Sequence, residues 1–280
     1  MSALVAALVA AAATVTVLMT ATAVVARRVG RLAVVDVVWG AGFVLVALVA
    51  AVVTTVVDAG GGGTVAQRWL LVLLVAVWGG RLAWHIRSRA HGLLGPGETP
   101  PEDPRYAQLM EGKPFSYAVT RVFVTQGVAM FVVALPVVVG AAVAVPASSW
   151  QRWPIVLGVV VFAVGLAFEA RGDAQLAAYK EIPKPERPPV LDTGLWAWTR
   201  HPNYFGDATV WWGLWLVGGL GSGWVAGLAT VVAPIAMTYF LAFATGARLL
   251  EREMMQRPGY PEYAARTSMF VPRPPRRRAG

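Results

Sequence analysis

A polar stretch, LWAWTRHPNYFGD at residues 195–207, interrupts an otherwise apolar chain. Because the residue before a proline avoids the helical region, Pro202 predicts a loop at its N-terminal side, and Asn203 can cap the helix that follows. The N-terminus of a helix attracts anions, and Arg200 and His201 add positive charge there. The stretch therefore predicts a site for an anionic ligand, although a purely structural capping motif has the same residues.

An aspartate one turn into the predicted helix extends this site. Asp207 can accept hydrogen bonds from an amide or a hydroxyl group. Together with the positive charge before it, Asp207 fits a large, anionic cofactor that also carries hydrogen-bonding groups.

A second polar set lies in the segment FEARGDAQLAAYK, where Glu169, Asp173 and Lys180 have a spacing of i, i+4 and i+11. On a helix this spacing places all three on one face. Two acids beside a base predict the wall of a polar pocket. The alternative is an ion pair within the helix, with the other charge solvated.

A third set follows an apolar run, where Trp78, Arg81, His85 and Arg89 share one helical stripe at i, i+3, i+7 and i+11. Arginine and histidine at a membrane interface can extend their polar ends toward water. Arg81 lies deeper within the apolar run, and a charged residue at such a depth normally faces a partner or a cavity.

One carboxyl group occurs in the second apolar segment. Asp36 precedes Trp39 by three residues, and a carboxyl group held at that depth could donate a proton in catalysis. From spacing alone, an ion pair with Arg31 or Arg81 explains it equally well.

The elements that must position these residues are membrane helices. Hydrophobic residues make up 57% of the 280-residue chain and charged residues 14%, with a mean hydropathy of +0.58. A membrane span needs about 20 apolar residues. Seven stretches meet this need: 3–26, 33–57, 69–87, 118–145, 154–172, 204–221 and 224–247.

The distribution of basic residues predicts the topology. With the N-terminus outside, the outer loops carry only Arg68 and Arg152, and all other Lys and Arg lie on the inner side, as cytoplasmic loops prefer. The prediction is an all-α integral membrane fold of seven transmembrane helices with a cytoplasmic C-terminus. Residues 1–272 form one domain, and residues 273–280 form a disordered basic tail that meets anionic lipid headgroups.

Composition also excludes several kinds of site. The chain has no cysteine, which excludes disulfides and thiolate sites, and its three histidines lack a metal-ligand spacing, so no metal is expected. The net charge of +9 is explained by the membrane topology, so no nucleic-acid partner is expected.

Several motifs together resemble the steroid 5-alpha-reductase C-terminal domain superfamily, in its bacterial branch described as a domain of unknown function. The resemblance covers most of the chain. Its motifs are Asp36-Val-Val-Trp39-Gly40, Trp78-Gly-Gly-Arg81-Leu-Ala-Trp84-His85, Glu102-Asp103-Pro-Arg105-Tyr106, Glu169-Ala-Arg-Gly-Asp173, Arg200-His-Pro-Asn203-Tyr204-Phe-Gly206-Asp207, Leu250-Glu251 and Tyr260-Pro-Glu-Tyr263.

The resemblance implies a reductase of the cytoplasmic membrane that binds NADPH on its cytoplasmic side and reduces a carbon–carbon double bond conjugated to a carbonyl. The substrate is steroid-like or another lipid-soluble molecule. By similarity, the cofactor-binding residues are Arg81, His85, Glu169, Asp173, Lys180, Arg200, His201, Asn203, Tyr204, Asp207, Glu251 and Tyr263.

The catalytic positions depart from the family pattern. Eukaryotic steroid reductases polarise the substrate carbonyl with a glutamate on the second helix and a tyrosine on the third. The nearest positions here are Asp36 and Trp78, and a tryptophan has no phenol proton to give.

Two other functions fit parts of the sequence. Isoprenylcysteine carboxyl methyltransferases share the RHPxYxG motif and bind S-adenosylmethionine, but their tandem glutamate is replaced here by Glu251-Arg252-Glu253. A lipid carrier or transporter would place polar residues at the midplane of the membrane and contain inverted repeats, neither of which the sequence has.

Overall fold

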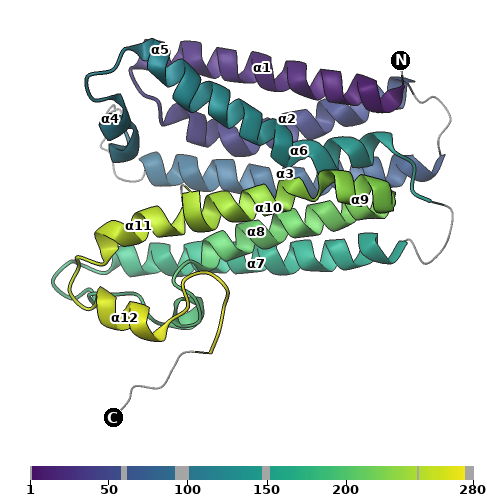
Figure 1. Cartoon of the computed structure of the whole chain (residues 1–280). Helices are drawn as coiled ribbons and strands as arrows, with labels where there is room; N and C mark the ends of the chain where they lie inside the picture. Colours follow the sequence, from purple (N-terminus) through teal and green to yellow (C-terminus); the bar gives the residue numbers. More distant parts are fainter. Residues whose placement is uncertain (1, 58–61, 92–100, 147–151, 245, 275–280) are drawn as a thin grey trace. The chain divides into compact units, whose positions relative to one another are not determined.

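The fold is entirely helical over the residues that the structure describes, a computed structural model covering 2–57, 62–91, 101–146, 152–244 and 246–274 (Figure 1). Within these ranges there is no strand, only an isolated bridge between Thr199 and Ser268. Six helical segments are long and apolar enough to cross a membrane, so the chain is a multi-pass membrane protein. They are Ala3–Val29, Val34–Val57, Val65–Ser88, Phe115–Ala142, Trp153–Glu181 and Trp224–Met254.

The chain divides into two compact units, which are described separately. Unit 1 is Met1–Ile155 with Trp215–Ala233, and unit 2 is Val156–Leu214 with Pro234–Gly280. The prediction of one domain over 1–272 is not tested by this division.

Unit 1 is built on four long helices and a few short ones. These are α1 (Ala3–Val29), α2 (Val34–Val57), α3 (Gly62–His91), α4 (Pro104–Met110), α5 (Phe115–Ala118), the π-helix η1 (Val119–Val124), α6 (Thr125–Ala142), the π-helix η4 (Trp215–Gly219), the 3-10 helix η5 (Leu220–Ser222) and α9 (Trp224–Thr230).

Glycines let the backbones in unit 1 approach closely. A Cβ added to Gly40 of α2 would lie 2.5 Å from the carbonyl oxygen of Gly79 in α3. Likewise, a Cβ on Gly218 of η4 would lie 2.2 Å from the carbonyl oxygen of Pro136 in α6. In lipid, such close packing of small residues replaces the hydrophobic effect as the main attraction between helices.

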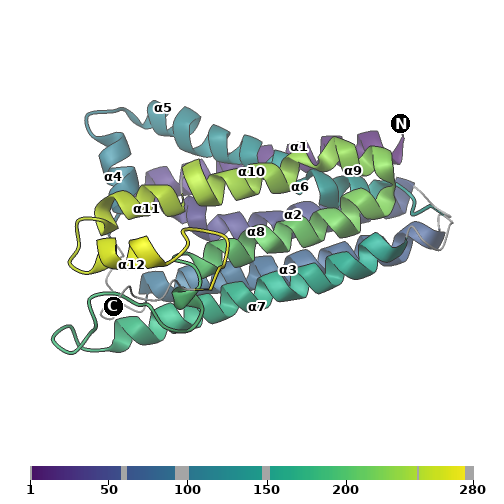
Figure 2. The same cartoon turned by 60° about the horizontal axis from the view of Figure 1, so that its bottom comes forward.

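Unit 2 is built on one long helix, a shorter helix beside it and the C-terminal helices. These are most of α7 (Trp153–Glu181), the 3-10 helix η3 (Gly194–Ala197), α8 (Pro202–Leu214), most of α10 (Val232–Tyr239), the π-helix η6 (Phe240–Ala244), α11 (Ala247–Met254) and α12 (Tyr260–Arg266). Helices α7 and α8 run side by side in both views (Figure 1, Figure 2).

The predicted seventh span at 204–221 is not among the six. There the chain keeps α-helical hydrogen bonding only over Pro202–Leu214 and continues as π-helix η4 and 3-10 helix η5. The change of helix type occurs around Gly218, where an added Cβ would lie 2.2 Å from the carbonyl oxygen of Pro136 in α6.

Arg68 was predicted to lie in an outer loop, and this is wrong. Helix α3 begins at Gly62, and the Arg68 side chain is buried with 1% of its surface exposed. Its Nε donates to the carbonyl oxygen of Ala141 at 2.9 Å, and Nη1 donates to Thr55 Oγ1 at 3.0 Å. The arginine thereby satisfies a carbonyl at the end of α6 that the helix itself leaves open.

Candidate functional site

A seam of glycines brings the predicted site residues of α7 and α8 together. A Cβ on Gly206 would lie 2.4 Å from the backbone nitrogen of Glu169, and one on Gly165 would lie 2.6 Å from the nitrogen of Val210. The seam uses glycines seven residues apart, a spacing that keeps one face of a helix against its neighbour. They are Gly158, Gly165 and Gly172 on α7 with Gly206 and Gly213 on α8.

The seam places the first turns of α8 against the acidic residues of α7. Asn203 Nδ2 donates to Asp173 Oδ1 at 3.1 Å, and Asn203 Oδ1 accepts from the backbone of Tyr204. The carboxylate-bearing residues Glu169, Asp173 and Asp207 are 3%, 8% and 7% exposed. Burying carboxylates is costly, and such groups occur mainly where function needs them.

Helix α8 begins at Pro202, two residues earlier than a cap at Asn203 would allow. Proline is favoured in the first position of a helix because its missing N–H has no partner to lose there. Asn203 therefore lies inside the first turn, and its predicted role as the helix cap is wrong. Its side chain instead links the start of α8 to α7.

Arg200, His201 and Glu251 form a tight cluster. Arg200 donates from Nε to Glu251 Oε1 at 2.6 Å and from Nη2 to Oε2 at 2.8 Å. His201 Nε2 lies 3.1 Å from Glu251 Oε1. Burial alone would lower the pKa of Arg200, but its hydrogen bonds with Glu251 outweigh this and raise the pKa. The positive charge of Arg200 is thus paired with an acid of the same unit.

The C-terminal segment is fastened to the loop before α8. Arg200 Nη1 donates to the carbonyl oxygens of Ala264, at 2.8 Å, and Thr267. The hydroxyl of Tyr263 donates to the carbonyl oxygen of Trp196 at 2.6 Å. Burial raises the pKa of Tyr263, which keeps this phenol protonated at neutral pH. The guanidinium of Arg200 and the phenol of Tyr263 are therefore both engaged within the protein.

Two further predicted residues differ in their surroundings. The rings of His201 and Tyr204 are stacked, with centroids 5.5 Å apart and planes within 6°. Lys180, in contrast, is exposed near the end of α7, while Glu169 and Asp173 on the same helix are buried. The predicted helical face therefore exists, but its basic end lies in solvent.

In unit 1, Asp36 is bound by residues that sequence spacing did not indicate. The hydroxyl of Tyr106 donates to Asp36 Oδ1 at 2.7 Å, and Arg105 Nη2 donates to Oδ2 at 3.2 Å. The same Tyr106 hydroxyl accepts from Gln126 Nε2 at 3.1 Å. Burial, followed by the charge of Asp36, raises the pKa of Tyr106, so the phenol keeps its proton at neutral pH.

Local capping explains why Tyr106 meets Asp36. Glu102 accepts hydrogen bonds from the backbone nitrogens of Leu32 and Ala33 at the start of α2. Asp103 then caps α4 by accepting from the nitrogen of Arg105 at 2.9 Å. Because one carboxylate holds α2 and the next starts α4, the tyrosine in the first turn of α4 is brought to the first turn of α2.

The other predicted residues of unit 1 lie on α3. Trp78 is fully buried, and its ring meets that of Phe43 edge-on at 5.7 Å. Arg81 and His85 are half-buried further along the same helix. The side chain of Arg89 lies outside the described residues. The predicted cofactor residues thus fall in two groups, Arg81 and His85 in unit 1 and all others in unit 2.

The residues that the sequence did not assign a role are Tyr106, Gln126 and Tyr260. Tyr106 belongs to the motif Glu102-Asp103-Pro-Arg105-Tyr106, and the two acids of this motif are the only sequence feature that points to the tyrosine. Tyr260 is buried, with its hydroxyl 3.4 Å from Glu251 Oε1. Over the described part of the chain, no group of three or more His, Asp or Glu side chains could hold a metal ion.

Comparison with known proteins gives one match. A family model with the description "Protein of unknown function (DUF1295)" matches residues 22–267. Searches of curated proteins and of solved structures each found no match.

Proposed function

The chain belongs to the DUF1295 family, and from this premise and its two polar sites we propose that it is an NADPH-dependent membrane reductase. The substrate is a lipid-soluble molecule with a carbon–carbon double bond conjugated to a carbonyl group. The resemblance of its motifs to the steroid 5-alpha-reductase superfamily supports the same reaction class.

The observation that carries this proposal is the 2.7 Å hydrogen bond from Tyr106 to Asp36. Reduction of an enone needs a group that polarises the carbonyl oxygen as negative charge develops there, and a protonated phenol can do this. Transfer of a methyl group to a carboxylate needs no such proton donor. Tyr106 thus supplies the phenol that the sequence lacked at Trp78, and Asp36 with Gln126 orients it.

The residues of unit 2 suit a dinucleotide. The carboxylates of Asp173 and Asp207 can accept hydrogen bonds from ribose hydroxyls and an amide, and the Tyr204 ring offers a flat face. The N-terminus of α8 attracts phosphate. When bound, NADPH supplies the hydride. Since Arg200 is engaged by Glu251, a phosphate would share this arginine with the acid instead of meeting a bare cation.

The reaction assigns a position to each group of the substrate. The hydride would go to the β-carbon, the double-bond electrons would move toward the carbonyl, and the α-carbon would then take up a proton from water, so the substrate gains two hydrogens and loses one double bond. In the substrate complex the Tyr106 hydroxyl would turn its one proton from Asp36 to the carbonyl oxygen, while Gln126 Nε2 still donates to the phenol oxygen. Asp36 acts on the substrate only through Tyr106.

The proposal includes a topology of seven spans with the N-terminus outside. The seventh would be the helical run of α8, η4 and η5, which extends from Pro202 to Ser222. At about 1.5 Å per residue such a run comes close to the roughly 30 Å of the hydrocarbon core. The dense inner-side charges support a cofactor site at the cytoplasmic face of the cell membrane.

Thermal unfolding of the full chain in detergent tests the cofactor. NADPH at a hundredfold excess over its Kd should raise the melting temperature by about 5–10 °C, and NADH should do less. Asp207→Asn and Asp173→Asn should remove the shift. Glu253→Gln, an exposed acid of α11, is the matched control and should keep it. Stabilisation by S-adenosylmethionine with no response to NADPH would replace the reductase with a methyltransferase.

A further inference from the structure

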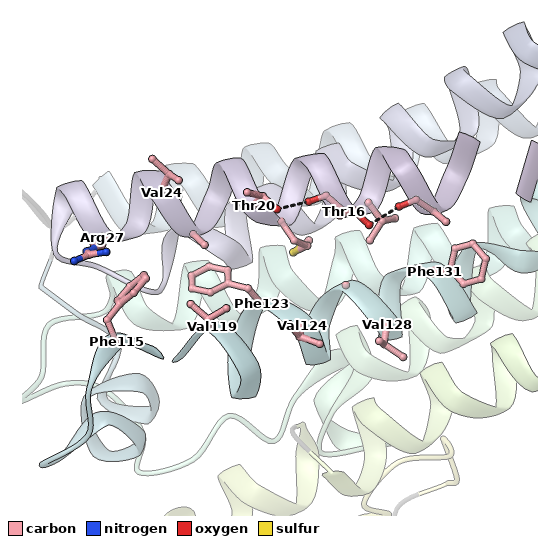
Figure 3. Close-up of a pocket in the computed structure, with 15 residues that line it drawn as sticks. Thr16, Thr20, Val24, Arg27, Phe115, Val119, Phe123, Val124, Val128 and Phe131 are labelled. Carbon is pink, nitrogen blue, oxygen red and sulfur yellow. Dashed lines mark hydrogen bonds between the residues drawn. The ribbon is translucent and has the colours of Figure 1, made fainter. Parts of the chain in front are cut away.

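An open groove runs along unit 1 between α1 and the continuous helix of α5, η1 and α6 (Figure 3). Its volume is about 520 Å³, within the range of roughly 300–1,000 Å³ that ligand sites occupy. On α1 the lining residues lie on one helical face and run from Ala12 to Arg27. On the opposite wall the lining residues run from Phe115 to Phe131. At 1.5 Å per residue the α1 wall is roughly 22 Å long, so the groove is narrow and elongated.

The walls of the groove offer hydrocarbon to an occupant. The hydroxyl groups of Thr16 and Thr20 donate to carbonyl oxygens of their own helix, those of Ala12 and Thr16, at 2.8 Å each. Gly127 lets α1 come close, since a Cβ there would lie 3.2 Å from Met19 Cγ. A space with so few polar partners does not hold water stably. Both walls belong to helices that can span a membrane, so a hydrocarbon chain is the natural filling.

One end of the groove is cationic. Figure 3 shows Arg27 beside Phe115, and its guanidinium carbon lies 5.7 Å from the ring centroid. Arg27 is exposed, and no carboxylate among the described side chains forms an ion pair with it. Nearby on the chain, Lys113 and Arg121 lie over the ring of Tyr117 at 6.0 and 5.7 Å. An anion at this end would therefore meet unneutralised positive charge.

We propose that this groove is a binding site for an anionic phospholipid. One acyl chain lies along the groove, and the phosphate meets Arg27 at its end. The elongated shape favours an extended chain over a compact ring system, and the cationic end favours an anionic headgroup over a zwitterionic one. This site is independent of the proposed reductase activity and serves to hold a lipid between α1 and α6.

Photo-crosslinking of the full chain in nanodiscs tests the site. The probes are phosphatidylglycerol and phosphatidylcholine that carry the same photoreactive acyl chain, followed by peptide mapping. Phosphatidylglycerol should label the facing walls of α1 and of η1 with α6 more strongly than the other lipid-facing helices. Arg27→Gln should lower the preference for phosphatidylglycerol about fivefold, since a basic residue near a headgroup contributes about 1 kcal/mol.

Filling the groove gives a second, independent measurement. Thr20→Trp on the groove wall should reduce labelling of α6 to the level of the other lipid-facing helices. Val25→Trp is the matched control, because Val25 is on the same helix, is 44% exposed and does not line the groove. Equal labelling on all lipid-facing helices, or a headgroup preference that survives Arg27→Gln, would overturn the proposal. So would displacement by oleate but not by phosphatidylglycerol, which would point to a free fatty acid.

Discussion

Arg200 and Glu251 form a two-point ion pair, with Nε 2.6 Å from Oε1 and Nη2 2.8 Å from Oε2. Their side chains are only 10% and 13% exposed. The arginine also holds the carbonyls of Ala264 and Thr267, so one side chain joins the loop before α8 to helices α11 and α12. The ion pair thereby holds the loop before α8 against the C-terminal helices of the polar site.

Removing one member of this pair should destabilise the protein without any ligand. Glu251→Gln leaves a buried guanidinium uncompensated, which typically costs about 3–5 kcal/mol. Arg200→Lys should also destabilise, because an ammonium group cannot make the two parallel bonds. Thermal unfolding in detergent measures both, with Glu253→Gln as an exposed control. Unchanged stability together with lost NADPH binding would instead assign the pair to the ligand.

The glycine seam of α7 and α8 predicts a second effect. Gly206→Ala would place a Cβ 2.4 Å from the Glu169 nitrogen, so the helices must separate. The cost should be about 1–3 kcal/mol, as in other overpacked contacts. Gly80→Ala is the control, since nothing lies within 4 Å of a Cβ there. If both variants unfold at the same temperature as the parent, the close approach of α7 and α8 is wrong.

Tyrosine ionisation predicts an alkaline limit of stability. Burial raises the pKa of Tyr106, Tyr260 and Tyr263 above the ordinary value of about 10. A group whose pKa is raised by folding contributes stability that is fully present below its unfolded pKa and is lost as the pH rises through the folded pKa. The free energy of unfolding should therefore fall above about pH 10.

Tyrosinate absorbance provides the measurement. These three phenols should resist ionisation until the chain unfolds. Tyr263→Phe should remove one resistant group and cost about 1 kcal/mol for its lost hydrogen bond to Trp196. Titration of all tyrosines near their ordinary pKa in the folded protein would contradict this burial.

Most of the fold could be predicted from the apolar segments of the sequence. Six of the seven predicted apolar segments overlap helices that can span a membrane, because length and hydropathy alone determine that property. The segment at 204–221 is not among the six because its α-helix ends at Leu214 and the run continues as π-helix η4 and 3-10 helix η5, so the seventh span stays a prediction. The prediction that Arg68 lies in an outer loop is wrong, because only the folded chain shows that its guanidinium donates to a carbonyl of α6.

The candidate site could be predicted only where its residues are close in sequence. Asp173 and Asn203 were both singled out, but their hydrogen bond links two helices and follows from the glycine seam. The sequence offers Arg31 or Arg81 as the partner of Asp36, whereas the structure pairs it with Tyr106, 70 residues away. The hydrogen bonds of Glu102 and Asp103 bring Tyr106 and Asp36 together. Hydrophobic periodicity cannot predict such hydrogen bonds.

The hydrogen bond between Tyr106 and Asp36 makes the most direct prediction about catalysis. Tyr106→Phe keeps the ring and removes the phenol proton, so kcat for NADPH oxidation with a conjugated ketosteroid or a linear enone should fall by about 10²–10⁴-fold. Asp36→Asn should have a smaller effect, because it acts through the tyrosine. The thermal shift with NADPH should stay unchanged in both variants. Tyr117→Phe, a half-buried tyrosine of α5, is the matched control and should keep parent activity. An unchanged kcat in Tyr106→Phe would remove the phenol from the mechanism and with it the main support for enone reduction.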